Sequence, residues 1–169
     1  AGVEARDVEV VEAHGTGTSL GDPIEAQSLA AVYGASRART AETQQERFVL
    51  GSAKTNIGHL EGAAGIAGLL KVVLSLANEA IPPHLHLERM NPHMPELGET
   101  LHAVIPRVAL AWPRRAGRVR VGCVSSFGIT GTNAHAIVSE APATAAKGTP
   151  IATTTTTTTT TMAEVDAIA

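Results

Sequence analysis

Three apolar segments of the chain each end in a turn rich in glycine and small polar residues. Each segment is followed by its turn, with at most one residue between them: residues 8–13 by 14–21, 48–52 by 54–61, and 119–125 by 126–133. Short apolar runs bounded by such turns predict buried strands. Layered α/β folds place their functional sites at the strand ends of a sheet. The pattern therefore predicts an α/β sheet with a site where these turns meet.

Two helices are expected between the strands. Asp22 is a suitable N-cap, Pro23 then occupies the first helical position, and Glu25 is placed as a capping-box partner. This helix is expected to run to about Tyr33 and to end at a C-terminal cap on Gly34.

Residues 62–77 are apolar and rich in small side chains, which predicts a second, buried helix that packs closely. Further strands are expected at 101–105, 109–112 and 134–140, with an irregular proline-containing segment at 81–94. The resulting order of elements is β-α-β-α-β-β.

Composition excludes several classes of protein. The net charge is −3 and the basic residues are scattered. The sequence therefore lacks the basic patch that would predict binding to nucleic acid. The apolar stretch 62–77 contains Lys71 and is shorter than the roughly 20 residues of a membrane-spanning helix. Cys123 is the only cysteine, so no internal disulfide forms, and without an initial signal peptide we expect a soluble, cytoplasmic protein.

The two ends of the chain differ from its middle. Nine consecutive threonines occupy residues 153–161, and a homopolymer cannot specify a packed core, so we expect 143–169 to be a disordered linker or tail. The ordered domain is expected over residues 1–142. Because the first residue is Ala1 and a strand begins by Val8, we expect the chain to be a fragment.

His14 and His59 are the main candidates for chemistry. Each lies in a glycine-containing turn after a predicted strand. A lone histidine is most simply a partly buried, satisfied side chain, but two in equivalent turns favour a site. Neutral imidazole can donate a hydrogen bond to a developing oxyanion. Lys54 and Glu25 are either solvated charges or, if the turns meet, a pair that fixes the geometry around His59.

Other kinds of site are disfavoured. The glycines at 15, 17 and 21 do not have the dinucleotide-binding spacing, and no P-loop is present. His84, His86 and His93 lie in the proline-containing segment and are expected to be ordinary loop residues rather than metal ligands. Cys123 lies within an apolar strand, which favours a buried structural thiol over a nucleophile.

Three motifs together resemble one family. VEAHGTGTSLGDPIEA (11–26), GSAKTNIGHLEGAAGIAGLLK (51–71) and VSSFGITGTNAHAIVSEAP (124–142) are similar to the C-terminal signatures of β-ketoacyl synthases, above all those of modular polyketide synthases. IPPHLHLERMNPHM resembles the family's connecting segment. The resemblance covers residues 1–142.

This resemblance implies half of a thiolase-like fold, in which two similar halves form α/β/α/β/α layers. The implied reaction is decarboxylative Claisen condensation in polyketide or fatty-acid biosynthesis. A malonyl-type extender on acyl carrier protein loses CO2, and the enolate attacks an acyl group held on a cysteine. No cofactor is implied beyond the phosphopantetheine arm of the carrier protein, which is a substrate carrier.

By the same resemblance, His14 and His59 assist decarboxylation and stabilise the enolate oxygen. Lys54 resembles the lysine that organises the site, and Glu25 is its expected partner. The implied substrate-binding residues are Thr16 and Thr18 for the phosphopantetheine arm, Phe127 for the acyl pocket, and Ile129, whose N–H is an oxyanion-hole donor.

The family's nucleophilic cysteine belongs to an N-terminal half that this sequence does not contain, and Cys123 does not match it. The expected partners are that N-terminal half, acyl carrier protein and, in the complete enzyme, a second copy in a homodimer. The chain alone is expected to be inactive. The alternative hypothesis is a non-catalytic thiolase-like half that binds carrier protein or acyl chains.

Overall fold

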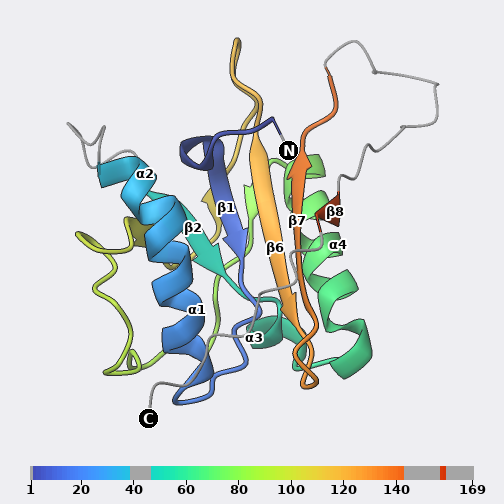
Figure 1. Cartoon of the computed structure of the whole chain (residues 1–169). Helices are drawn as coiled ribbons and strands as arrows, with labels where there is room; N and C mark the ends of the chain where they lie inside the picture. The colour runs from blue at the N-terminus through green and yellow to red at the C-terminus, as the bar shows by residue number, and fades with distance from the viewer. Residues whose placement is uncertain (1, 39–46, 143–156, 159–169) are drawn as a thin grey trace.

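The computed structural model describes residues 2–38, 47–142 and, for the backbone alone, 157–158. Within these residues six strands form one mixed sheet in the order β4-β2-β1-β6-β7-β8 (Figure 1). Their bounds are β1 Val8–Glu12, β2 Phe48–Gly51, β4 Ala103–Val104, β6 Val121–Phe127, β7 Asn133–Ser139 and β8 Thr157–Thr158. β1 runs parallel to both β2 and β6, and β2 is parallel to β4, whereas β7 is antiparallel to β6. A separate pair joins β3 (Ala80–Ile81) to β5 (Leu110–Ala111).

Helices cover both faces of this sheet (Figure 1). On one face, α1 (Gly21–Leu29) continues through the π-helical segment η2 (Ala30–Gly34) into α2 (Ala35–Ala38). On the other, α4 (Ala64–Ala77) packs on β6 and β1 and follows the short helix α3 (Lys54–Ile57). Single 3-10 turns occupy Ala5–Asp7 (η1) and Glu61–Ala63 (η4). Among the helices of residues 2–38 and 47–142, none has the length and apolar character of a membrane-spanning segment.

Two apolar cores result from the alternation of side chains along the central strands. Val11 and Cys123 face α1 and η2, where they pack with Leu29, Tyr33 and Phe48. The neighbouring residue Val10 faces the other way, toward α4. It belongs to a second core that also contains Val72, Leu76, Ile81, Trp112 and Val138. Burial of this central strand on both faces explains why the adjacent residues Val10 and Val11, which face opposite sides of the sheet, are both apolar.

The first helix differs from its prediction at both ends. It begins at Gly21, and Asp22 lies inside the first turn and accepts a hydrogen bond from Gly17 N–H (3.0 Å) instead of capping the helix. Gly34 does not end the helix either. A Cβ on Gly34 would lie 2.6 Å from the carbonyl oxygen of Thr100, so this glycine permits close backbone packing.

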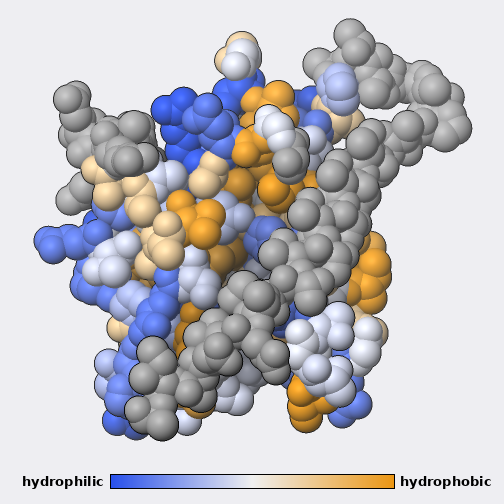
Figure 2. Space-filling view, in the orientation of Figure 1, coloured by the Kyte–Doolittle hydropathy of each residue, from blue (hydrophilic) through white to orange (hydrophobic). Residues whose placement is uncertain are grey.

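The second helix is not buried all round, in contrast to the prediction from its sequence. Gly68 lets it approach the sheet, because a Cβ there would lie 2.9 Å from Val124 Cγ2. Its other face exposes Ile66, Leu70 and Leu74. Figure 2 shows apolar surface along the edge where α4 lies and at the tip of the β6–β7 hairpin.

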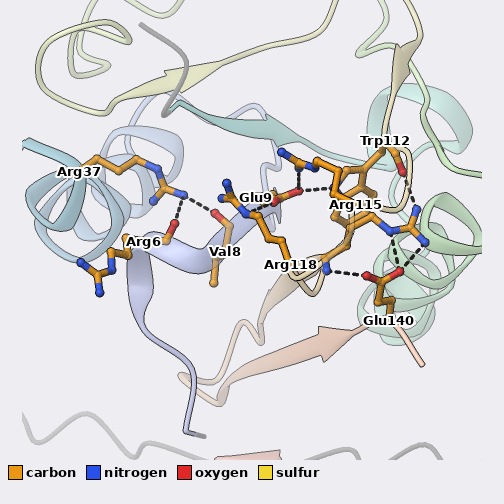
Figure 3. Close-up of polar contacts among 9 residues, drawn as sticks. Arg6, Val8, Glu9, Arg37, Trp112, Arg115, Arg118 and Glu140 are labelled. Carbon is orange, nitrogen blue, oxygen red and sulfur yellow. Dashed lines mark hydrogen bonds and ion pairs between the residues drawn. The ribbon is translucent and has the colours of Figure 1, made fainter. Parts of the chain in front are cut away.

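Charged residues close the end of the sheet at which β1 begins (Figure 3). Glu9 forms ion pairs with Arg115 (2.7 Å) and Arg118 (2.9 Å). The fully buried Arg120 pairs with Glu140 at 2.8 Å. These contacts anchor the segment between β5 and β6 at the end of β1 opposite to His14.

The predicted disordered tail, 143–169, falls almost entirely outside the described residues. Its one described part is the two-residue strand β8, which pairs antiparallel with His135 and Ala136 of β7. The disorder of this segment stays a prediction.

Candidate functional site

The turns that follow β1, β2 and β6 meet at one end of the sheet, as their sequence pattern predicted. The hydrogen bonding between β1 and β2 continues to the residue before the first turn, because Ala13 N–H donates to the Gly51 carbonyl (2.8 Å). The rings of His14 and His59 lie 5.6 Å apart, centroid to centroid, with planes at 87°. The Phe127 ring lies 5.3 Å from that of His14. Three segments distant in sequence thus contribute to one cluster.

Backbone hydrogen bonds define which nitrogen of each histidine can donate. His14 Nδ1 accepts from Phe127 N–H (3.3 Å), and His59 Nδ1 accepts from Glu61 N–H (2.9 Å). A nitrogen that accepts carries no proton, so each neutral ring holds its proton on Nε2. Both histidines therefore have an Nε2–H donor that the described chain does not use.

Glu25 fixes the backbone of the first turn. It is buried in α1, and its two carboxylate oxygens accept from the N–H groups of His14 (2.8 Å) and Gly15 (2.9 Å). Burial raises the pKa of Glu25, and these two hydrogen bonds oppose that shift. The prediction of a capping-box role for Glu25 is wrong, because both oxygens are used across the turn.

Lys54 opens α3 and acts on the site through its charge. No carboxylate of the described residues lies within 4 Å of its ammonium group, so the expected direct pair with Glu25 is not formed. Burial lowers the pKa of Lys54, while Glu12, Glu25 and Asp22 raise it. The pKa of His14 is lowered first by burial and then by electrostatic interaction with Lys54 and His59. These effects favour a neutral His14.

Thr16 and Thr18 lie in the exposed part of the first turn. Thr18 Oγ1 accepts from Gly21 N–H (3.0 Å), which shapes the approach to α1 and leaves the hydroxyl hydrogen of Thr18 free to donate. Gly15 and Gly17 adopt φ of +49° and +78°, in the left-handed region that favours glycine.

Phe127 and Ile129 come from the β6–β7 hairpin. The loop is closed by Gly128 N–H to the Thr132 carbonyl (2.7 Å). The Ile129 side chain is fully exposed, and within the described residues its N–H has no acceptor. That N–H is available to a ligand.

Glu12 is the residue of the site that the sequence did not identify. It is 2% exposed at the end of β1, accepts from Ala53 N–H and pairs with Lys71. The available signal was a second acidic residue, in addition to Glu9, in a short valine-rich strand and only two positions before His14.

The remaining candidates lie apart from the cluster. Cys123 is fully buried in β6, where burial raises the pKa of its thiol to about 12, which agrees with a structural role. His86 and His93 are exposed, and the described residues contain no group of three or more His, Cys, Asp or Glu side chains arranged to hold a metal ion.

Known proteins match both the sequence and the fold. Residues 1–88 match the family described as "Beta-ketoacyl synthase, C-terminal domain". A phenolphthiocerol/phthiocerol polyketide synthase of Mycobacterium tuberculosis is 49% identical over 138 residues, which cover 82% of this chain and 6% of that protein. Mycoketide-CoA synthase of the same species is 48% identical over 143 residues, covering 84% of this chain and 3% of that protein.

Among solved structures, the ketosynthase from module 6 of the bacillaene synthase of Bacillus subtilis 168 superposes with a TM-score of 0.72. It is 37% identical, and the match covers 83% of this chain and 24% of that chain. The predicted fold class is confirmed, since these neighbours are ketosynthases of the thiolase-like class. The chain spans only a small part of each relative it matches. It belongs to the β-ketoacyl synthase family, of which it contains the C-terminal domain.

Proposed function

We propose that this chain supplies the histidine-bearing part of a β-ketoacyl synthase that performs decarboxylative condensation in polyketide or fatty-acid biosynthesis. The observation that carries the proposal is the pairing of His14 and His59. Their rings are 5.6 Å apart, and each Nδ1 is occupied by a backbone N–H. Two Nε2–H donors are thus available to one substrate oxygen.

The proposed step begins with a malonyl-type thioester. The bond between its carboxylate carbon and its α-carbon breaks, CO2 leaves, and the electron pair forms an enolate whose charge lies on the thioester oxygen. His14 and His59 donate hydrogen bonds to that oxygen. The enolate carbon then attacks an acyl thioester on a cysteine, and the cysteine thiolate is released.

Lys54 has an electrostatic role in this proposal. Its charge lowers the pKa of His14, so the imidazole remains a neutral donor. Glu25 holds the backbone of the same turn. Thr16 and Thr18 bind the phosphopantetheine arm, Phe127 lines the acyl pocket, and Ile129 N–H stabilises the oxyanion formed on acyl transfer.

The proposed partners follow from what the chain does not supply. Its only cysteine is buried in β6, so the nucleophile comes from the N-terminal ketosynthase half. Acyl carrier protein delivers the extender, and the complete enzyme forms a homodimer. A free internal thiol fits the reducing cytoplasm.

The alternative function is that of a thiolase-like half that binds carrier protein or acyl chains and does not catalyse condensation. Such a protein would not need two histidine N–H groups arranged as hydrogen-bond donors. The arrangement of both histidine Nδ1 atoms as acceptors favours the catalytic role. Thr18, which would contact the arm under either hypothesis, does not discriminate between them.

The test is His14→Ala in the chain assembled with a ketosynthase N-terminal half. We expect the variant to accept an acyl group on the partner's cysteine but to decarboxylate malonyl carrier protein about 10²–10³-fold more slowly, as for loss of one oxyanion donor. His93→Ala, which removes an exposed loop histidine, is the matched control. Normal decarboxylation by His14→Ala, measured as CO2 release, would refute the proposal.

A further inference from the structure

A buried ion pair involves the strand residue two positions before His14. Lys71 Nζ on α4 is 2.7 Å from Glu12 Oε2 at the end of β1. The side chains are 14% and 3% exposed, respectively. A pair this shielded from solvent costs desolvation free energy, and specifying a geometry is one reason such pairs are retained.

Two glycines make room for the pair. A Cβ on Gly51 would lie 3.2 Å from Lys71 Nζ, and a Cβ on Gly68 would lie 3.1 Å from Glu12 Cγ. Because β2 and α4 both leave space, the sequence accommodates the charged side chains within the layer between helix and sheet.

The second oxygen of Glu12 connects the pair to the site. Glu12 Oε1 accepts from the N–H of Ala53, the residue that precedes α3. Glu12 lies two residues before His14, while Ala53 begins the turn that leads to His59. One carboxylate thus joins the strand that ends at the first histidine to the turn that carries the second.

We propose that Glu12 is a positioning residue that sets the separation of the His14 and His59 rings by holding Ala53 N–H, while Lys71 compensates the charge of the buried carboxylate. This inference rests on the proposed function for its importance to catalysis. Its structural content, the link between Glu12 and the ring pair, is independent of that function.

The pair also contributes to the field at the site. Glu12 is the first of the carboxylates that raise the pKa of Lys54, and Lys54 in turn lowers the pKa of His14. Lys71 of α4 binds one carboxylate oxygen of Glu12, and the N–H of Ala53, directly before α3, binds the other. The carboxylate is thereby held between two fixed donors.

The experiment compares two double variants of the full 169-residue chain. Glu12→Gln/Lys71→Met removes both charges and keeps an acceptor oxygen for Ala53 N–H. Glu12→Met/Lys71→Met removes the charges and the acceptor with similar side-chain volume. Glu9→Gln is the matched control, because Glu9 is an ion-paired carboxylate at the other end of the same strand.

The readout is NMR of the histidine rings, with the nuclear Overhauser contact between His14 and His59 and the ring-nitrogen shifts that report Nε2–H. We expect the Gln/Met variant and Glu9→Gln to retain the contact, and the Met/Met variant to lose it. If the Met/Met variant does not fold, Glu12→Asp replaces it, and its shorter side chain must weaken the contact.

Retention of the contact in the Met/Met variant or in Glu12→Asp would overturn the inference. Loss in the Gln/Met variant, or equally in Glu9→Gln, would also overturn it, since the acceptor would then not be the determining group. A second readout in the assembled enzyme is the rate of decarboxylation. We expect it to fall at least tenfold in the Met/Met variant and to be restored in large part by Gln/Met, with little change in KM. A change in ring contact without a change in rate would contradict the proposed function, not the positioning.

Discussion

The carboxylate of Glu25 binds the backbone of His14 rather than the side chain of Lys54. Its Oε1 atom lies 2.8 Å from His14 N, and its other oxygen takes the adjacent amide of Gly15. The contact joins α1 to the turn after β1 and holds the backbone of that turn at His14 and Gly15.

Replacing Glu25 by Gln should therefore destabilise the fold. An amide offers one acceptor oxygen for two N–H groups, so one buried donor would face the NH2 group. A buried unsatisfied donor costs about 1–3 kcal/mol. We expect the free energy of unfolding in urea to fall by about that amount, while Glu88→Gln at an exposed position changes it by less than about 0.5 kcal/mol. Equal stability of the two variants would contradict this account.

Lys54→Met should shift the pH dependence of decarboxylation. The ammonium of Lys54 lowers the pKa of His14, second only to burial, so its removal raises that pKa. Neutral His14 is the donor, and it is lost as the pH falls through its pKa. The acidic limb of the rate profile should therefore move to higher pH, and Lys54→Arg, which keeps the charge, should leave it near its original position.

Titration of the His14 ring by NMR, in the original chain and in Lys54→Met, measures the expected rise in the pKa of His14 without an assay of catalysis. Because the folded pKa of His14 lies below its ordinary value of 6.5, its contribution to stability is present above pH 6.5 and is lost as the pH falls through the folded pKa. An unchanged His14 titration in Lys54→Met would show that the lysine acts by another route.

Cys123 should behave as a structural thiol. It is fully buried, and its pKa is raised to about 12 by burial, so almost no thiolate is present at neutral pH. Iodoacetamide should label it in urea but not in the native chain. Cys123→Ala should cost about 1 kcal/mol of stability through the small cavity it leaves, and condensation by the assembled enzyme should survive.

Much of the fold could be predicted from local patterns. The predicted strands are confirmed at Val8–Glu12 and Phe48–Gly51. They could be predicted because a short run rich in apolar residues, followed by a glycine-containing turn, is a local signal of a buried strand. His14 and His59 could be identified because equivalent turns of parallel strands meet at one end of a sheet.

The errors have a common physical origin in long-range packing. Gly34 has the sequence context of a helix cap, but its requirement comes from Thr100, 66 residues away in sequence. Glu12 resembles a solvated strand residue until Lys71 and Ala53 are brought to it by the fold. The sequence of 62–77 is almost entirely apolar, so its periodicity does not show which face of α4 packs on the sheet and which face is left exposed.

That exposed side leads to a prediction about assembly. Ile66, Leu70 and Leu74 are 54%, 53% and 58% exposed and follow one another at helical spacing of four. An apolar stripe of this kind marks an interaction surface. We expect it to contact the N-terminal ketosynthase half, so that co-expression with that half gives a soluble complex. Leu70→Glu should abolish co-purification, whereas Val108→Glu, at a site 67% exposed outside the stripe, should not.

Acyl transfer should follow this assembly. The chain alone should form no adduct with acyl thioesters, because its single thiol is buried in β6 and protonated at neutral pH. Covalent capture requires an accessible thiolate, which divides one difficult step into two easier ones. Intact-protein mass spectrometry should therefore place the acyl group on the cysteine of the N-terminal half in the complex and nowhere on this chain. Leu70→Glu should lose acylation together with co-purification. A stable acyl adduct on Cys123 of the lone chain would refute the assignment of the nucleophile to the partner.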